Sequence, residues 1–191
     1  FLFFMKPMMK TMIGMDYDRG LKMLKEWLET GSVSASTEIK GVESVGPIRM
    51  AGVTSTCHVN DIAEDMGRSI ELAEARFLTL KLPAEEGVSV YTGFKMSQGL
   101  FSYITGFMIP DSAAEQLEGL QVWSLPACKA LRVDQTGCYT HLGNGWSAAN
   151  QHARYKKLKQ AKLGTFEIYR KSPHHTDVPS EYETEIYLPL R

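Results

Sequence analysis

Two short segments near the C-terminus, TFEIYRK and TEIYLPL, carry the residues best suited to chemistry. Both alternate polar and apolar residues, a pattern typical of β-strands, in which successive side chains point to opposite faces of a sheet. One face would carry the carboxylates and phenols Glu167, Tyr169, Glu185 and Tyr187. The other would carry Phe166, Ile168, Ile186 and Leu188. We expect the apolar set to lie under helices and the acidic and phenolic set to line a cleft on the opposite face.

A carboxylate among aromatic rings predicts a site for an organic cation. Each well-placed ring attracts a delocalised or quaternary cation by about 0.5–2 kcal/mol, and a mostly apolar pocket with few polar groups is usual for small-molecule sites. Tyr91, in the strand-like segment VSVYTGF, would face the same cleft. Trp146 lies on the apolar stripe of a predicted helix, where it either packs in the core or forms the end wall of the cleft.

Structural roles are the alternative for each of these residues. Most glutamates on strands are solvated, so the alternative for Glu167 and Glu185 is an ion pair with a neighbouring strand, and that for Tyr169 and Tyr187 is to cover the sheet. If Glu167 is instead buried among tyrosines, loss of hydration raises its pKa. We would then expect cation binding to weaken at acid pH.

Composition narrows the class of protein. The 191 residues include 21 Lys and Arg and 22 Asp and Glu, for a net charge of −1, so the chain lacks the positive field that drives binding to a phosphate backbone. The 43% of hydrophobic residues can form a core, which excludes a mainly disordered chain. No apolar run is long enough to span a membrane, and no segment remains for a helix-turn-helix, so we expect no specific DNA binding by this chain.

Cysteine usage gives two further expectations. Three cysteines do not make a disulfide framework, which favours a reducing, cytoplasmic location. Cys57-His58 and the pair of Cys138 with His141 resemble metal ligands, but no second pair with suitable spacing accompanies either. We therefore expect neither a metal nor a cofactor.

The elements that position these residues follow the same order twice. PIRMAGVTSTCHV predicts a strand, a helix follows from Asn60 or Asp61 to about Leu80, and VSVYTGF with LFSYITGFMI predicts a hairpin. WSLPACKALRV as a strand, a helix over 139–159 and the two C-terminal segments then repeat this order.

Spacing supports a duplication. Ile109-Pro110 and Leu188-Pro189 end the last strand of each half and lie 79 residues apart. The sequence therefore predicts an α+β fold of two βαββ repeats, 47–115 and 120–191, related by a pseudo-twofold axis. Such a fold has an antiparallel sheet with two helices on one face and, we expect, a ligand cleft on the other.

Residues 1–30 are predicted to form a separate helical tail. The apolar positions that recur with helical spacing are Leu21, Leu24 and Leu28. Asp16 or Asp18 is suited to cap this helix, and the Ser-, Thr- and Gly-rich residues 31–46 predict a linker or an extended lead-in. Because the leucine stripe would otherwise be exposed, we expect a homodimer through this helix.

The C-terminal half resembles a known family. KALRVDQTGCYTHLGNGW, FEIYRKSP and TEIYLPL resemble the GyrI-like effector-binding domain, which is also the ligand-sensing part of AraC-type and multidrug-sensing transcription regulators. The resemblance covers residues 45–191. It implies a duplicated βαββ unit with a central cleft for lipophilic, often cationic, small molecules, and it implies a cleft glutamate at Glu167.

The resemblance also sets limits on the site and on the tail. The first half has Ser89 where the second has Glu167, so we expect one anion rather than two. Residues 1–30 resemble the last helix of SRPBCC (polyketide-cyclase-like) domains, which implies that the tail is the end of such a preceding domain or a relict of one.

Three functions follow as alternatives. The first is a binding module that senses or sequesters a lipophilic, cationic small molecule, with a link to transcription regulation. The second is a hydrolase of an electrophilic toxin, in which Glu167 is the base and Tyr187 or Tyr91 donates the proton. The third is a protein–protein role, such as the protection of gyrase that the family name implies.

Overall fold

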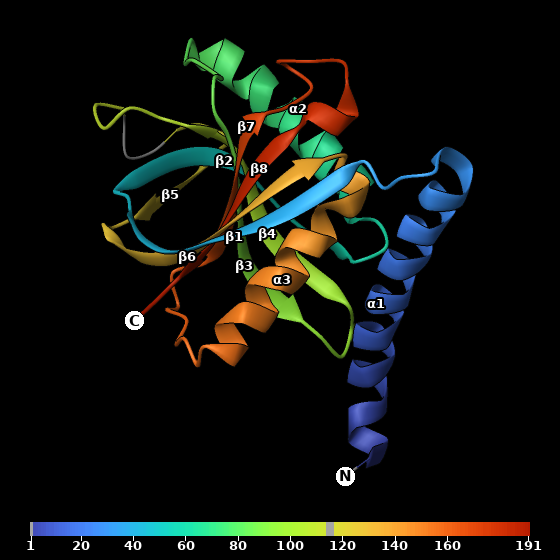
Figure 1. Cartoon of the computed structure of the whole chain (residues 1–191). Helices are drawn as coiled ribbons and strands as arrows, with labels where there is room; N and C mark the ends of the chain where they lie inside the picture. The colour runs from blue at the N-terminus through green and yellow to red at the C-terminus, as the bar shows by residue number, and fades with distance from the viewer. Residues whose placement is uncertain (1, 114–116) are drawn as a thin grey trace.

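The computed structural model describes residues 2–113 and 117–191, with side chains from Met9 onward. This part of the chain contains α1 (Leu2–Thr30), α2 (Ile62–Leu80) and α3 (Leu142–Tyr155), together with eight strands (Figure 1). The strands are β1 (Ala35–Val45), β2 (Ile48–His58), β3 (Gly87–Lys95), β4 (Leu100–Met108), β5 (Gln121–Leu125), β6 (Cys128–Gly137), β7 (Thr165–Lys171) and β8 (Glu183–Pro189). Residues 114–116, at the end of the expected first repeat and the start of the join between the repeats, lie outside the described residues.

All eight strands form one antiparallel sheet, which confirms the predicted α+β class. Their order is β1-β6-β8-β7-β3-β4-β2-β5. The order is symmetrical about its centre, where β7 of the second βαββ unit pairs with β3 of the first. Ser89 and Glu167, which lie 78 residues apart in the sequence, are directly opposite each other in this central pair. The predicted pseudo-twofold axis therefore passes between these two residues.

The segment expected to be a linker or an extended lead-in contains an edge strand. Within residues 31–46, Ala35–Val45 forms β1 and pairs with β6 along its whole length. Thr37, Ile39 and Val42 are β-branched residues that favour extended backbone, and the Ser and Gly residues around them obscured this signal. Similarly, Pro126 divides the expected strand 123–133 into β5 and β6, because proline cannot donate to a ladder.

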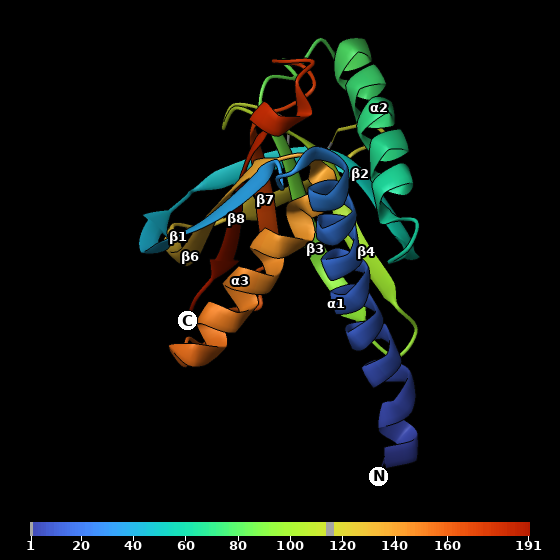
Figure 2. The same ribbon diagram turned by 45° about the vertical axis from the view of Figure 1, so that its right-hand side comes forward.

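Helices α2 and α3 cover the same face of the curled sheet, here called the helix face (Figure 2). Ala149 and Ala153 of α3 pack on buried aliphatic side chains of β6 and β8, while Phe77 of α2 packs edge-to-face on Phe107 of β4, with ring centroids 5.2 Å apart. A third cluster, on the opposite face, is formed by Met50, Val88, Val90, Ile104, Leu125, Ala130, Phe166, Ile168 and Tyr187.

A glycine brings α3 close to the sheet. A Cβ atom at Gly145 would lie 2.5 Å from Cδ1 of Ile186 on β8, so a larger residue here would push the helix outward. The close approach places the next residue, Trp146, above the central strands. The helix itself is shorter than expected, because a 3₁₀ turn at Tyr139–His141 precedes it and it ends at Tyr155.

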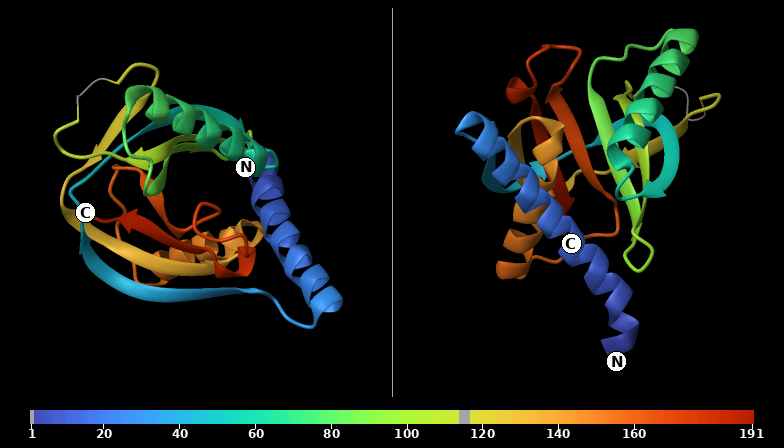
Figure 3. Two further views of the ribbon diagram at one scale, coloured as in Figure 1. Left: turned by 90° about the horizontal axis from the view of Figure 1, so that it is seen from above. Right: turned by 90° about the vertical axis from the view of Figure 1, so that its right-hand side faces the viewer.

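Helix α1 stands away from the body of the molecule (Figures 1 and 3). It begins at Leu2, so Asp16 lies inside the helix, where it pairs with Arg19 at 3.1 Å instead of capping the N-terminus. Its contacts with the body include Asn144 Nδ2, which lies 3.3 Å from Met23 Sδ, and His141 Nε2, which lies 2.5 Å from Glu26 Oε2. In the described part of the chain, no helix is both long and apolar enough to cross a bilayer.

Candidate functional site

The Glu167 carboxylate lies at the centre of the sheet, beside the pseudo-twofold axis. Its side chain is 0% exposed. Oε2 accepts a hydrogen bond from the Tyr169 hydroxyl at 2.7 Å, and Oε1 accepts one from the Tyr91 hydroxyl at 3.2 Å. Oε1 also accepts a hydrogen bond from the indole Nε1 of Trp146. The structure therefore brings together residues from β3, β7 and α3 around one carboxylate.

Burial dominates the electrostatics of this carboxylate. Loss of hydration raises the pKa of Glu167 above its ordinary value, although the hydrogen bonds from Tyr169, Trp146 and Tyr91 oppose the shift. Burial and the nearby Glu167 charge also hold the pKa values of Tyr91 and Tyr169 well above the usual phenol range. Among the described residues, no Lys, Arg or His forms an ion pair with Glu167.

The first half supplies a neutral counterpart to this acidic site. Ser89 Oγ lies 2.7 Å from Thr105 Oγ1 and 2.9 Å from the Tyr169 hydroxyl. Met66 of α2 covers this pair, with its sulfur 3.5 Å from the Tyr169 hydroxyl. Met66 of α2 therefore covers Ser89 in the same way that Trp146 of α3 covers Glu167. The two central positions carry one carboxylate and one hydroxyl, as the replacement by Ser89 led us to expect.

Aromatic rings form the outer layer of the site. Tyr91 contacts Trp146 edge-to-face, with centroids 5.1 Å apart, and lies 5.9 Å from Phe101. Tyr139, in the turn before α3, packs on Tyr169 at 5.6 Å. Tyr91, Trp146 and Tyr139 are partly exposed, whereas Tyr169 is buried. Aromatic rings therefore lie between the carboxylate and solvent, with Tyr139 outside the buried Tyr169.

A second carboxylate on the helix face, that of Asp65, has hydrogen-bond and ion-pair partners within the chain. Asp65 of α2 accepts hydrogen bonds from the hydroxyls of Ser55 and Tyr103, each at 2.6 Å, and lies 3.5 Å from Arg68. The hydrogen bond from Ser55 and then that from Tyr103 lower the pKa of Asp65. Asp65 therefore has an ion-pair partner within the chain, which Glu167 lacks among the described residues.

The expectation that Glu185 and Tyr187 share a face with Glu167 is wrong. The register of β7 and β8 pairs Phe166 with Tyr187 and Glu167 with Ile186. Directly paired residues point to the same side of a sheet, so Glu185 and Tyr187 lie on the opposite face. The prediction that Phe166 lies under a helix is also wrong. Its ring stacks on that of Tyr187 on the opposite face, with centroids 4.9 Å apart. Glu167 was predicted to lie on the face opposite the helices, but it lies on the helix face.

On the opposite face, Glu185 belongs to an ionic network. Its carboxylate lies 2.7 Å from Arg132 and 2.8 Å from Arg170, and it accepts a hydrogen bond from the Tyr187 hydroxyl at 2.9 Å. Arg170 also pairs with Glu86, just before β3. This is the pairing with neighbouring strands that the structural alternative for Glu185 described.

Sequence reasoning did not identify Met66 or Tyr139 as part of the site. Met66 lies 80 residues before Trp146, close to the spacing of the repeats, so the duplication itself could have indicated it. Tyr139 was included as the first residue of the helix predicted over 139–159. The 3₁₀ turn that directs it toward Tyr169 has no clear signal in the sequence.

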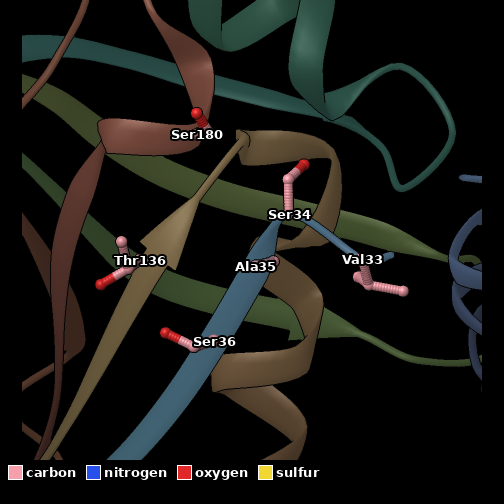
Figure 4. A pocket seen from close by; sticks show the side chains of 6 residues that line it. All are labelled: Val33, Ser34, Ala35, Ser36, Thr136 and Ser180. Carbon is pink, nitrogen blue, oxygen red and sulfur yellow. The ribbon is translucent and has the colours of Figure 1, made fainter. Parts of the chain in front are cut away.

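A hollow of about 220 Å³ lies elsewhere, at the start of β1 (Figure 4). Its lining residues are Val33, Ser34, Ala35, Ser36, Thr136 and Ser180. It has no charged side chain and includes none of the residues around Glu167. No group of three or more His, Cys, Asp or Glu suited to a metal occurs in the described residues.

The fold and the site together define a class, a duplicated βαββ domain with one buried carboxylate under aromatic rings, suited to a small molecule. Over residues 42–191 the chain matches the model of the GyrI-like small molecule binding domain. The chain belongs to this family. The match begins within β1, and the likeness of residues 1–30 to an SRPBCC helix stays a prediction. A comparison with curated proteins finds no match.

Solved structures with the same fold include members of regulatory systems. EcmrR in a complex with DNA has a TM-score of 0.63 and 12% identity, over 94% of this chain and 66% of the EcmrR chain. SAV2435 bound to tetraphenylphosphonium has a TM-score of 0.57 and 16% identity, over 81% of this chain and 94% of that one. A conserved protein from Listeria innocua has a TM-score of 0.54 and 13% identity, over 80% and 93%. At these identities the likeness shows the fold alone.

Proposed function

We propose that the chain binds a lipophilic organic cation over Glu167, between α2 and α3. The observation that carries this proposal is a fully buried carboxylate with no cationic partner among the described residues. A buried charge without a counterion is unfavourable, and in this fold it lies where the two halves meet. A cation brought in from outside would restore the balance of charge.

The surrounding rings favour a delocalised, poorly hydrated cation over a metal ion or a simple ammonium. Tyr91, Trp146 and Tyr139 offer aromatic surfaces rather than ligand oxygens, and cation–π attraction strengthens as the cation loses water. SAV2435, which has the same fold, is bound to tetraphenylphosphonium in its solved structure. This supports tetraphenylphosphonium as the first probe.

The test is calorimetric titration of the whole chain with tetraphenylphosphonium. We expect saturable binding by the wild type and a loss of affinity of about thirtyfold or more in Glu167→Gln, because the variant removes a desolvated charge partner. Glu183→Gln, an exposed residue of β8, is the matched control and should bind as the wild type does. Equal affinities for the wild type and Glu167→Gln would refute the proposed role of the carboxylate.

We further propose that the chain acts in a reducing, cytoplasmic compartment as a ligand-sensing module linked to transcription. Cys57, Cys128 and Cys138 are free thiols, and EcmrR, with the same fold, is found in a complex with DNA. The described part of this chain would supply the sensing step. DNA binding by the present chain alone is not expected.

One observation supports hydrolysis as a second candidate function. Tyr91 and Glu167 place a phenol 3.2 Å from a carboxylate, as a proton donor and a base would be placed. Tyr187 lies on the opposite face and cannot serve with Glu167 as we had expected. Incubation with styrene oxide, followed by chromatography for the diol, tests this function. Turnover that is lost in Glu167→Gln would favour a hydrolase over a binding module.

A further inference from the structure

Access to Glu167 is closed in this structure. The carboxylate is completely covered, and both of its oxygens accept hydrogen bonds from the chain itself. A tetraarylphosphonium or similar cation is far too large to fit between the carboxylate and the side chains that are hydrogen-bonded to it. For such a ligand to contact Glu167, at least one of the covering side chains must move.

Trp146 is the one covering side chain that belongs to a helix and not to a central strand, and its ring also packs against the aliphatic cluster between α3, β6 and β8. Tyr91 and Tyr169 belong to the two central strands, and the Tyr169 ring is also held by Tyr139. Trp146 is on α3, is partly exposed, and is followed one helical turn later by Asn150 at the surface. Rotation of its side chain breaks no strand pairing.

The contacts of Trp146 link its position directly to the carboxylate. Its indole N–H donates to Glu167 Oε1, and its ring packs edge-to-face against Tyr91. Met66, the corresponding residue on α2, contacts Ser89 and Tyr169 but no carboxylate oxygen. The two helices therefore carry an aromatic donor on one side and a flexible thioether on the other, and only the aromatic donor holds Glu167.

We propose that Trp146 is a gate, held shut by its hydrogen bond to Glu167, which swings outward to admit a cation and then offers its ring to the ligand. This rests on the proposed function and deepens it. The shut state satisfies the carboxylate when no ligand is present, and a ligand must replace the indole N–H. The apparent affinity then depends on the fraction of molecules in which the gate is open.

The shut state is tested first without a ligand. Exchange of the indole N–H with solvent is measured by NMR on the whole chain, with Trp27→Phe and Trp123→Phe used to assign the three tryptophans. We expect the N–H of Trp146 to exchange at least about tenfold more slowly than that of exposed Trp27. Protection of the Trp146 N–H from exchange should be lost in Glu167→Ala and kept in Glu167→Gln, because glutamine retains a hydrogen-bond acceptor. Exchange as fast as that of Trp27 in the wild type would overturn the gate.

Opening is tested with tetraphenylphosphonium and stopped-flow kinetics. Trp146→Phe keeps a ring but removes the N–H, so the shut state is weakened and the association rate constant should rise about fivefold or more. Trp27→Phe, on the exposed side of α1, is the control and should leave the rate unchanged. An association rate that is unchanged or lower in Trp146→Phe would contradict the gate.

The outcomes separate the gate from the proposed function. If tetraphenylphosphonium binds in a manner that depends on Glu167 while the Trp146 N–H stays protected at saturation, the function stands and the gate is wrong. If only Trp146→Phe or Trp146→Ala binds, Trp146 is a fixed barrier, and a gate that opens for this cation is wrong. If neither the wild type nor these variants bind, both proposals fail.

Discussion

The cation binding proposed at Glu167 would couple ligand affinity to pH. Burial raises the pKa of this carboxyl, so at pH values below the raised pKa the folded chain holds a proton that a bound cation must displace. We predict that affinity for tetraphenylphosphonium falls as the pH decreases through this pKa, by up to about tenfold per pH unit. Calorimetry in buffers of different ionisation enthalpy measures the released proton. A flat profile between about pH 5 and 8, where a raised carboxyl pKa would act, would contradict the prediction.

The same residue should make the ligand-free chain less stable than it could be. Folding raises the pKa of the Glu167 carboxyl above its value in the unfolded chain. The contribution of this group to stability is therefore complete at pH values below the unfolded pKa, and the free energy of unfolding decreases as the pH rises toward the folded pKa. We predict that Glu167→Gln stabilises the ligand-free chain at pH 7 by about 1 kcal/mol and removes this part of the pH dependence. Chemical denaturation at pH 4 and pH 7 measures both effects. A variant less stable than the wild type at pH 7 would show that the hydrogen bonds to the carboxylate outweigh its desolvation.

At the scale of the elements, the sequence predicted strands better than it predicted their faces. β7 lies at 165–171, where alternation placed it, and α2 follows Asp61 as expected. Alternation gives the two faces of one strand, but the register between two strands decides which faces coincide. β7 and β8 pair with Glu167 beside Ile186, and no local pattern contains that information. For the same reason Tyr187 was wrongly placed on the face of Glu167.

Close contact between β2 and β4 depends on a pair of glycines. Gly52 and Gly106 are directly paired, and a Cβ at Gly106 would lie 2.1 Å from the carbonyl oxygen of Ala51. Backbone cannot yield as a flexible side chain can, so we predict that Gly106→Ala destabilises the chain by about 3 kcal/mol or more. Gly93→Ala on β3, where the nearest atom is 3.8 Å away, is the control and should change stability little. Thermal unfolding followed by circular dichroism measures both, and equal melting temperatures would contradict the prediction.

Helix α1 remains the element least tied to the rest. Three side chains with helical spacing, Arg19, Met23 and Glu26, face the start of α3 and are partly buried. Leu21, Leu24 and Leu28 are at least half exposed. Their exposure agrees with a helix that packs against something further, and pairing with a second copy stays a prediction that analytical ultracentrifugation can test.

At the scale of the whole molecule, the two halves exchange their first strands. β1 precedes the first βαββ unit but pairs with β6 of the second, while β5 precedes the second unit and pairs with β2 of the first. Neither half therefore completes its part of the sheet alone. Pairing between segments about ninety residues apart depends on the finished fold, which explains why a local interpretation of 31–46 gave a linker.

Two buried glutamates, Glu167 and Glu185, lie on opposite faces of the sheet, and we predict that they contribute differently to binding and to stability. Glu185 lies between Arg132 and Arg170, and Arg170 also pairs with Glu86, so this network joins the second half to the first. Removing the central charge leaves two guanidinium groups without their shared partner. Because both arginines are partly exposed, we predict a loss of about 1–3 kcal/mol of stability in Glu185→Gln.

We expect the Glu185→Gln substitution, which lowers stability, to leave cation binding unchanged. Glu185→Gln lies on the face away from Trp146 and should keep its affinity for tetraphenylphosphonium within about twofold of the wild type, since distant sites act independently. Glu167→Gln should be more stable and lose binding. Denaturation and calorimetry on the same two variants measure both properties. A folded Glu185→Gln that no longer binds the cation would move the ligand to the opposite face and refute the site proposed at Glu167.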